Sequence, residues 1–577
     1  MRMKCSWIWF VGFTAFFAVA VACVFWGTWS PEVSFIQPDQ GICYPAGFLM
    51  QKWRDVCGGT AVVPGDLRFL LGGPYAWQEL QYALAMYLAA LGVAYYLKGR
   101  GVGPLARYGA AAAYGLMGYN FTLFSAGHLG WFIFLMYGPF CFGLIDRCVR
   151  KGKWTNWVLL GGVLAWGSAQ QPDMWLLFTV MAFIYGVFRL VVQLRATLPS
   201  KRGRETVRIL CGVLVTAVAL VAVGWPQLKN AIFVQTANRD KQIAGATGEA
   251  QDDKPKSAEQ AKADREKRYV FCTNWSLPPD EIAEFVVPDL KGGSSDPRIS
   301  PRNPYKGRIG MQYAPGRWQP YRQHSLYMGF FTVCFALVGV AFGLRRKDAE
   351  VAFWSAMAAV LLVCALGCFT PFYRLVFAIP IGDYIRCPVK FVHLLEWCVA
   401  VLAGFGAAAL LDTRIAQRAP KVAAAAIAAI LVVNAVNLAV IDARYCAVDP
   451  GDTVRIAIAR ETGSVSIGFV MDGKAKLGGD EYVVAGGMAF QDNAALKDAM
   501  AKGTLSVVSF WNFNGGRLVK VARERAGFAL LRNSAPQPRD ERPTVPGAAT
   551  VISMLSTLAV CAAGVIKACW GRMRPRA

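Results

Sequence analysis

Long apolar runs alternate with polar loops along most of this chain. Each run approaches the roughly 20 residues that a helix needs to cross about 30 Å of hydrocarbon. About twelve such runs predict a polytopic membrane protein, because so much apolar surface would aggregate in water. We expect spans at 7–27, 79–97, 105–120, 128–146, 156–169, 173–193, 207–225, 325–344, 351–369, 389–411, 421–440 and 547–568.

The basic residues between these runs predict the orientation, since cytoplasmic loops accumulate Lys and Arg. With the N-terminus inside, every strongly basic loop falls on the cytoplasmic side, and so does the C-terminal tail. These loops lie at 98–107, 147–153, 195–208, 345–347, 414–421 and 567–576. The net charge of +24 is then explained by short loops that meet anionic membrane lipids, and no nucleic-acid partner is expected.

Three long segments, 28–78, 226–324 and 441–546, fall on the other side. Residues 239–268 contain few large apolar side chains and are expected to be a mobile insertion or an exposed helix. The segment 441–546 alternates β-branched runs with turn signals such as Asn514-Gly515, which predicts a small external α/β or β-rich domain.

The predicted fold is therefore an all-α polytopic membrane domain at 1–440, followed by the external domain and by a last helix with a basic tail at 547–577.

Cys43 and Cys57 share the first external loop and form either a disulfide or two free thiols. Cys and His residues with zinc-ligand spacing are missing from the sequence, so a structural zinc site is not expected.

Asp39 places a carboxylate in the first external loop, shortly after the first span. Such a group is a candidate general base for an acceptor hydroxyl if it reaches hydrogen-bond distance. The alternative is a solvated loop residue after a turn-forming Pro. Asp55 and Asp66 share the loop and compete for the same role.

Arg386 and Lys390 flank Pro388 where the chain enters the span 389–411. Cations at headgroup depth either snorkel without a partner or bind a phosphate, Arg through two hydrogen bonds and Lys as a point charge. His128, in the element Ala126 to Leu129, adds a polar group at the outer end of another span. Each is more simply explained as an interface residue, but their convergence on one side favours a site.

Four sequence elements resemble those of the YfhO-like membrane proteins of the GT-C glycosyltransferase superfamily. They are Asp39 with Tyr44-Pro45, then Ala126-Gly127-His128-Leu129, then an external stretch from Leu277 through Glu281, Pro288 and Gly292 to Asn303-Pro304-Tyr305-Lys306-Gly307 and Tyr327-Met328-Gly329, and finally Arg386, Pro388, Lys390 and Phe391 with Leu402 to Gly406. Two positions depart from the family pattern. Lys390 replaces the usual second Arg, and Gln170-Gln171-Pro172 stands where a Gly-His-Pro element is common.

The resemblance implies a GT-C type enzyme of a bacterial-type plasma (inner) membrane. Such an enzyme transfers a sugar from a polyprenyl-phosphate carrier to an extracytoplasmic glycan, lipid or protein by inverting displacement. It also implies Asp39 as the catalytic base. The implied substrate-binding residues are Tyr44, His128, Tyr305, Arg386 and Lys390. The resemblance does not establish a cofactor; a divalent metal ion, which some relatives use, is the candidate.

Two other classes of function fit the same sequence. A transporter or flippase for a lipid-linked substrate would carry ionisable residues or broken helices inside the membrane. Glu396 is the clearest ionisable residue inside an expected span, with His393 one turn before it. A non-catalytic assembly factor for the cell envelope would instead bind a partner through the segment 441–546.

Overall fold

A computed structural model describes residues 2–26, 29, 78–125, 134, 137–168, 172–229, 257–293, 302–310, 325–379, 382, 385–446, 474–477, 480–486, 505–509, 528–533 and 547–573. The helices are α1 (Arg2–Val24), α3 (Gln78–Gly99), α4 (Pro104–Gly115), α5 (Gly118–Ser125), α7 (Phe140–Lys151), α8 (Trp154–Ser168), α9 (Pro172–Ala196), α10 (Pro199–Lys229), α12 (Ala258–Cys272), α13 (Phe330–Arg345), α14 (Ala349–Ala365), α15 (Tyr373–Ala378), α16 (Phe391–Leu411), α17 (Arg414–Arg418), α18 (Pro420–Ala443) and α23 (Ala548–Met573). Short 3-10 helices are η3 (Pro279–Phe285), η4 (Gly367–Phe369) and η6 (Pro388–Lys390).

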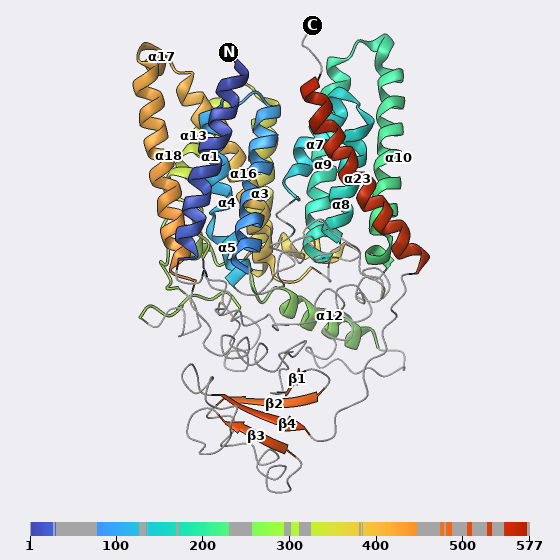
Figure 1. Cartoon of the computed structure of the whole chain (residues 1–577), viewed down its shortest axis with the longest axis vertical. Helices are drawn as coiled ribbons and strands as arrows, with labels where there is room; N and C mark the ends of the chain where they lie inside the picture. The colour runs from blue at the N-terminus through green and yellow to red at the C-terminus, as the bar shows by residue number, and fades with distance from the viewer. Residues whose placement is uncertain are drawn as a thin grey trace.

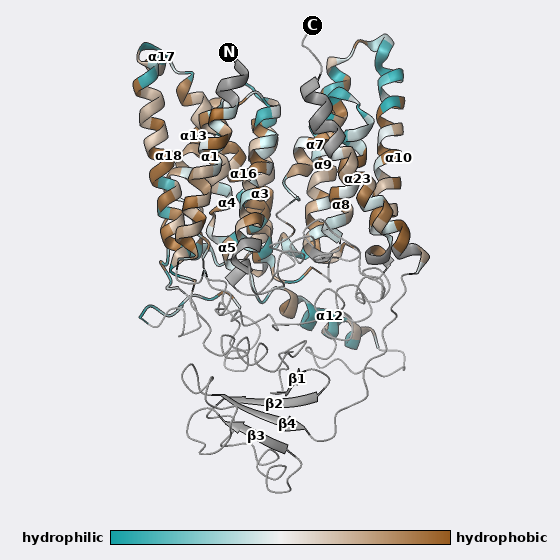
Figure 2. Ribbon diagram, viewed as in Figure 1, coloured by the Kyte–Doolittle hydropathy of each residue, from teal (hydrophilic) through white to brown (hydrophobic). Residues whose placement is uncertain are grey.

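The long helices stand in two groups (Figure 1). One group contains α1, α3, α4, α13, α16 and α18, and the other contains α7, α8, α9, α10 and α23. The first turn of α1 and the last turn of α23 lie at one end, here called the terminal side, while α12 lies toward the opposite end, the loop side. Figure 2 shows apolar residues along most of the helices and hydrophilic residues at several terminal-side turns.

Five of the described helices are long and apolar enough to cross a membrane. They contain the stretches Trp7–Val24, Met174–Ala196, Pro199–Trp225, Pro388–Leu411 and Pro420–Ala443. This length and composition indicate an integral membrane protein. Each segment expected to span the membrane contains a helix, but several of these helices are shorter or more polar than a full span. Twelve crossings therefore stay a prediction.

Two expected spans differ in their bounds from the helices found there. The segment 105–120 is interrupted after Gly115, and α5 begins at Gly118 with a new axis (Figure 1). Helix α7 begins only at Phe140, and much of the rest of the expected span 128–146 lies outside the described residues.

Helix α16 is the most deeply buried of the five candidate spans. Its closest neighbour, α13, approaches through glycines. A β-carbon at Gly406 would lie 1.8 Å from the carbonyl oxygen of Phe335, and one at Gly339 would lie 2.2 Å from that of Leu402. Small residues let the two helix backbones come this close, as is common between membrane helices.

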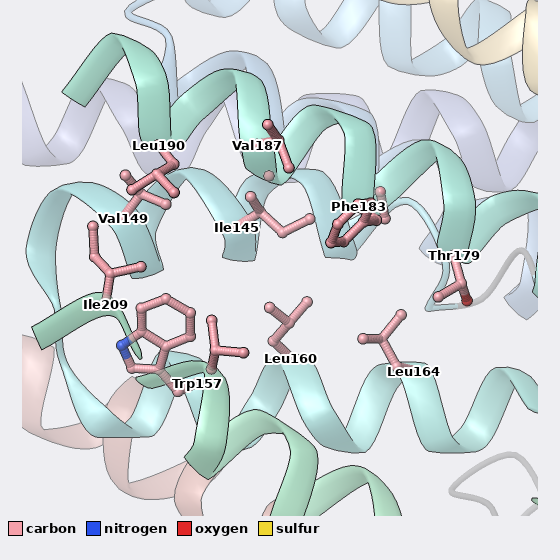
Figure 3. Close-up of a pocket in the computed structure, with 13 residues that line it drawn as sticks. Ile145, Val149, Trp157, Leu160, Leu164, Thr179, Phe183, Val187, Leu190 and Ile209 are labelled. Atoms are coloured by element: carbon pink, nitrogen blue, oxygen red, sulfur yellow. The ribbon is translucent and has the colours of Figure 1, made fainter. Parts of the chain in front are cut away.

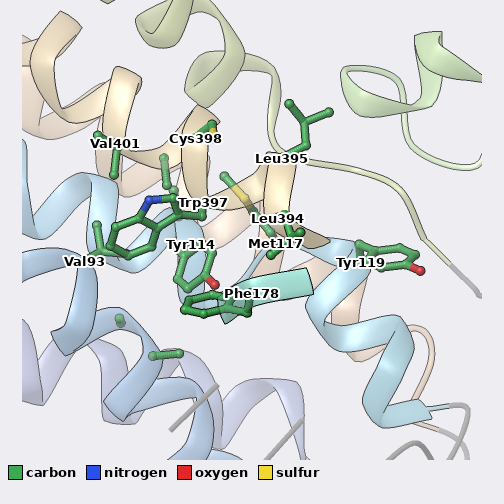
Figure 4. Packing of buried hydrophobic residues seen from close by; sticks show 14 of the residues in the cluster. Val93, Tyr114, Met117, Tyr119, Phe178, Leu394, Leu395, Trp397, Cys398 and Val401 are labelled. Carbon is green, nitrogen blue, oxygen red and sulfur yellow. The ribbon is translucent and has the colours of Figure 1, made fainter. Parts of the chain in front are cut away.

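An aromatic core joins the two helix groups around Trp397 of α16 (Figure 4). The Trp397 ring stacks on Phe142 of α7 at a centroid distance of 4.5 Å, and it meets Tyr114 of α4 edge-on at 5.9 Å. Phe142 also meets Trp354 of α14 edge-on at 5.2 Å. Offset and edge-on aromatic pairs of this kind stabilise a core beyond their buried area.

Five charged side chains pair with one another on the terminal side and form what we call the ion cluster. Asp146 of α7 contacts Arg100, Arg150 and Arg189 at 3.1, 2.6 and 3.0 Å, respectively. Glu350, in the first turn of α14, contacts Arg100 at 3.1 Å and Arg189 at 3.0 Å. Both carboxylates are at least 98% buried. The cluster therefore ties α3 of one group, together with α14, to α7 and α9 of the other.

Hydrogen bonds from neutral side chains complete the ion cluster. The hydroxyls of Tyr96 and Tyr185 donate to Glu350 at 2.5 and 2.6 Å, and the Trp354 indole N–H donates to the Tyr96 hydroxyl at 2.6 Å. These bonds satisfy one oxygen of Glu350 while the guanidinium groups hold the other. A buried ionic group with its lone pairs occupied in this way is compatible with a folded interior.

A layer of loops and short helices covers the loop side. It contains α12, which begins with a capping box between Ser257 and Gln260, and η3. Most of α12 is exposed, and it occupies the end of the stretch expected to be a mobile insertion or an exposed helix. The segment 272–277 anchors this layer, because the Leu277 N–H donates to the Ala365 carbonyl at 2.8 Å.

Four strands form one antiparallel sheet in the order β1-β2-β4-β3, within the segment expected to hold an external domain. They are β1 (Lys474–Leu477), β2 (Asp480–Gly486), β3 (Leu505–Ser509) and β4 (Phe528–Asn533). The register pairs Val483 with Leu531 and Val507 with Leu531, so β4 is a central strand. The sheet lies beyond α12 on the loop side (Figure 1).

Candidate functional site

The predicted site residues divide into two sets. Asp39, Tyr44 and His128 lie outside the described residues, as do Cys43 and Cys57. Arg386, Lys390 and Tyr305 are described, and all belong to the layer on the loop side or to its junction with α16.

The start of α16 is held in place by backbone hydrogen bonds to the segment 272–277. The N–H of Cys387 donates to the Cys272 carbonyl and the N–H of Val389 donates to the Trp275 carbonyl, both at 2.9 Å. Between these bonds Cys387 adopts a left-handed conformation with φ of 61°, which is rare for a residue with a β-carbon. Strain of this kind persists where the surroundings enforce it, and it is concentrated at functional sites.

This local structure places Arg386 two residues before η6 and Lys390 at the last position of η6. The Arg386 guanidinium lies 5.3 Å from the centre of the Phe271 ring, a cation–π contact. Its Nε atom is buried and has no hydrogen-bond partner within the described part of the chain. Lys390 is 5% exposed although it carries an ammonium group. A buried Lys390 and a half-buried Arg386 at the start of a membrane helix are suited to an anionic group.

Tyr305 lies in an adjoining loop and its hydroxyl is already used. It donates to Glu281 at 2.7 Å and accepts from the Ile309 N–H at 2.8 Å. Glu281 is fully buried and also accepts from the Arg308 N–H at 2.7 Å. These bonds give Tyr305 a structural role in the layer. Its loop touches the segment beside Arg386 and Lys390, because the Gly310 N–H donates to the Asn274 carbonyl at 2.9 Å.

Two further ionisable residues, His393 and Glu396, follow Lys390 by three and six residues along α16. We call these three residues the polar face of α16. Residues three apart lie on one side of a helix. His393 is 1% exposed and its Nδ1 atom has no partner in the described structure. Glu396 is fully buried; its Oε1 accepts the Tyr119 N–H at 3.1 Å, whereas Oε2 has no described partner. Unpartnered buried groups inside a membrane protein point to function.

The break between α4 and α5 lies directly beside Glu396, because Tyr119 belongs to the first turn of α5. The break is fixed at Gly118, whose N–H donates to the Tyr327 carbonyl at 2.8 Å. A β-carbon there would lie 2.2 Å from the Ser325 hydroxyl oxygen, so glycine is required. The positive end of the α5 dipole thus faces a carboxylate, an arrangement that interrupted membrane helices use at binding sites.

A second buried carboxylate, Asp442 at the end of α18, interacts electrostatically with Glu396. Asp442 is fully buried, and neither of its oxygens has a partner among the described residues. Within the described ranges, no three His, Cys, Asp or Glu side chains are grouped so that they would hold a metal ion.

Sequence reasoning selected Arg386 and Lys390 from their position at the outer end of a span, and both lie at the start of α16. It noted His393 and Glu396 only as weak signs of transport. Their three-residue spacing from Lys390 was the available signal. Asp442 was not selected, since a carboxylate at the end of an apolar run resembles an ordinary interface residue.

No protein-family model, no curated protein and no solved structure matches this chain. The resemblance to the YfhO-like proteins therefore rests on the sequence motifs, and family membership stays a prediction.

Proposed function

We propose that this protein is a membrane glycosyltransferase that moves a sugar from a polyprenyl-phosphate carrier to an acceptor on the loop side. In this proposal the loop side is extracytoplasmic and the terminal side, with its basic turns, is cytoplasmic. The observation that supports it best is the pair of cations at the start of α16, the buried Lys390 and the half-buried Arg386. Cations there are positioned for a lipid-linked phosphate whose tail lies among the helices.

The proposed reaction is a single displacement with inversion. The acceptor oxygen attacks the anomeric carbon of the sugar, the bond from that carbon to the phosphate oxygen breaks, and the acceptor proton passes to the carboxylate of Asp39. Polyprenyl phosphate leaves with the bonding electrons. Arg386 and Lys390 stabilise the negative charge that develops on it. The atoms balance without ATP or a metal ion.

The test is sugar transfer by the purified full chain with a panel of polyprenyl-phosphate hexoses. Asp39→Asn is expected to lower kcat by about 10²- to 10⁴-fold while donor binding persists. Arg386→Ala is expected to lower kcat/KM by about 10- to 100-fold, the equivalent of a lost charged hydrogen bond.

A matched control is Arg374→Ala on neighbouring α15. Arg374 is an exposed cation that pairs with Glu266 at 2.8 Å, so its loss should leave transfer unchanged. Wild-type rates in both Asp39→Asn and Arg386→Ala would remove the basis for the enzyme.

Transport of a lipid-linked substrate is the second candidate, and a specific observation favours it. The interrupted helix α4–α5 points its second segment at the buried Glu396, as the half-helices of transporters point at their substrates and ions. In a flippase, Glu396→Gln would stop lipid movement in vesicles and Asp39→Asn would leave it intact. In the enzyme, Asp39→Asn stops sugar transfer.

A further inference from the structure

An apolar groove lies between α7, α8, α9 and α10, and none of its lining residues belongs to α16 (Figure 3). Its volume is about 280 Å³. Aliphatic and aromatic side chains from these four helices project into it, among them Ile145, Leu160, Phe183 and Leu190 (Figure 3). A cavity lined in this way accepts hydrocarbon and offers almost nothing to a polar ligand.

The groove opens on the surface that would face the bilayer. Three of its lining residues, Phe183, Val187 and Val213, are 70%, 44% and 52% exposed, respectively. They belong to α9 and α10, two of the helices with the length and composition of a membrane span. Hydrocarbon chains of the membrane therefore have direct access to the groove.

The length of the groove matches one leaflet. Along α9 it extends from Thr179 to Leu190, which corresponds to about 16 Å at 1.5 Å per residue. Half of a hydrocarbon core of about 30 Å is about 15 Å. The groove is centred on the middle of α9, and Leu190 of α9 and Val149 of α7 mark its end nearer the terminal side.

Cationic groups surround the terminal-side end of the groove. Lys151 and Lys153 are exposed on the turn between α7 and α8, next to Trp154, which is 62% exposed. Neither lysine forms an ion pair with a described carboxylate. Arg208 lies against the same turn but is already paired with Glu205 at 2.5 Å. Exposed lysines and a tryptophan at this depth are suited to an anionic headgroup.

We infer that the groove binds one acyl chain of an anionic phospholipid whose phosphate lies at Lys151 and Lys153. The lipid belongs to the leaflet on the terminal side and fills the space between α8 and α9. This inference does not depend on the proposed glycosyl transfer, since the groove is separate from Arg386 and Lys390.

The test compares two substitutions at Gly186, a groove residue of α9. A β-carbon there would lie 3.9 Å from Ile145 Cγ2, an ordinary contact, so Gly186→Ala is tolerated. Gly186→Trp fills the groove. Phosphatidylglycerol and phosphatidylcholine are added to the purified full chain, and bound lipid is counted by native mass spectrometry. We expect wild type and Gly186→Ala to retain phosphatidylglycerol and Gly186→Trp to lose it.

The double variant Lys151→Gln with Lys153→Gln tests the headgroup separately and changes only exposed side chains. It should bind both lipids equally, which abolishes the preference for phosphatidylglycerol. Wild-type phosphatidylglycerol binding by a folded Gly186→Trp protein would overturn the inference, and so would an unchanged preference in the lysine variant. A wild-type dimer that Gly186→Trp separates would also overturn it, because a second copy would then occupy the groove.

Discussion

The ion cluster and the polar face of α16 bury the same kinds of side chain in opposite ways. In the ion cluster, the carboxylates of Asp146 and Glu350 contact guanidinium groups at 2.6–3.1 Å. On the polar face, His393 and Glu396 are equally buried but retain atoms without a described partner. Single atoms of the ion cluster, such as Oδ2 of Asp146 and Nε of Arg189, also have no described hydrogen-bond partner. Burial and unmatched atoms alone therefore do not distinguish the two regions; the ion pairs of the carboxylates do.

The energetic reason is desolvation. Removing a charge from water costs several kcal/mol, and close partners recover that cost only when geometry and hydrogen bonding are good. The ion cluster meets this condition through three guanidinium groups and two tyrosine hydroxyls. An unpartnered polar atom recovers nothing, so Nδ1 of His393 and Oε2 of Glu396 weaken the fold. A protein retains such groups where they bind a ligand or take part in a reaction.

The largest loss of folding stability is expected from Glu350→Leu. This change leaves the guanidinium groups of Arg100 and Arg189 with one buried carboxylate fewer, and breaking a buried ion pair costs about 3–5 kcal/mol. We expect a marked fall in the thermal unfolding midpoint of the purified protein, followed by circular dichroism. Adding Arg189→Met to this variant should restore part of the loss, since it removes an unpaired charge.

Asp412→Asn is the matched control for Glu350→Leu. Asp412 lies near Arg346 on the same side of the molecule, at 3.8 Å, but both side chains are more than half exposed. Exposed pairs contribute about 0–1 kcal/mol, so the midpoint should hardly change. Equal losses in the two variants would show that the ion cluster has no special role.

The difference between these regions also determines what sequence reasoning could find. The length of the apolar runs predicted a helix in each expected span, and the position of Arg386 and Lys390 beside Pro388 predicted cations at the start of α16. The ion cluster was not predictable. Arg100 and Arg150 lie in basic turns where a cytoplasmic loop charge is the ordinary explanation, whereas Glu350 opens a helix 200 residues after Arg150. Only the packing of α3, α7, α9 and α14 brings them together.

The break between α4 and α5 was missed for a related reason. Gly115 and Gly118 are small residues in an Ala-rich run, and a membrane helix tolerates Gly without interruption. The break depends on Ser325 and Tyr327, which lie more than 200 residues further along the chain and occupy the space beside Gly118. A single sequence carries no signal for that contact.

A smaller effect is expected from Tyr185→Phe, which keeps the ring and removes the hydroxyl that donates to Glu350 at 2.6 Å. A hydrogen bond to a charged group contributes about 1.5–3 kcal/mol. The matched control is Tyr373→Phe, because the Tyr373 hydroxyl donates to a neutral acceptor, the Ile385 carbonyl, at 2.9 Å. Its loss should cost about 1 kcal/mol. A larger loss for Tyr373→Phe in the same unfolding assay would contradict the assigned strength of the cluster.

Glu396→Gln should change stability by less than about 1 kcal/mol, because the amide oxygen still accepts the Tyr119 N–H and no ion pair with a described residue is lost. Activity, measured as sugar transfer and as lipid movement in vesicles, should nevertheless fall. Glu350→Gln serves as the control with the opposite pattern, because its main effect should be a loss of folding stability. A Glu396→Gln protein that unfolds as readily as Glu350→Gln would place Glu396 among the structural charges.

The smallest loss of folding stability is expected from a substitution of Asp280. Its carboxylate also has two cationic partners, but it is exposed to solvent. Asp280 contacts Lys291 at 2.8 Å and Arg308 at 2.6 Å, and its side chain is 45% exposed. Hydrogen bonds from Lys291 and then from Arg308 lower the pKa of Asp280 from 3.8 to about 2. A carboxyl group whose pKa is lower in the folded state stabilises the fold above pH 3.8, and this contribution is lost as the pH falls toward 2.

The wild type should therefore unfold at a slightly higher temperature than Asp280→Asn at pH 6, and the gap should close between pH 4 and pH 2. Solvent and salt screen such a pair, so 1 M NaCl should close the gap at pH 6 as well. A gap as large as that of Tyr185→Phe, or one that survives at pH 2, would mean that partner number rather than burial sets the strength of an ion pair here. The contrast between the ion cluster and the polar face of α16 would then need another cause.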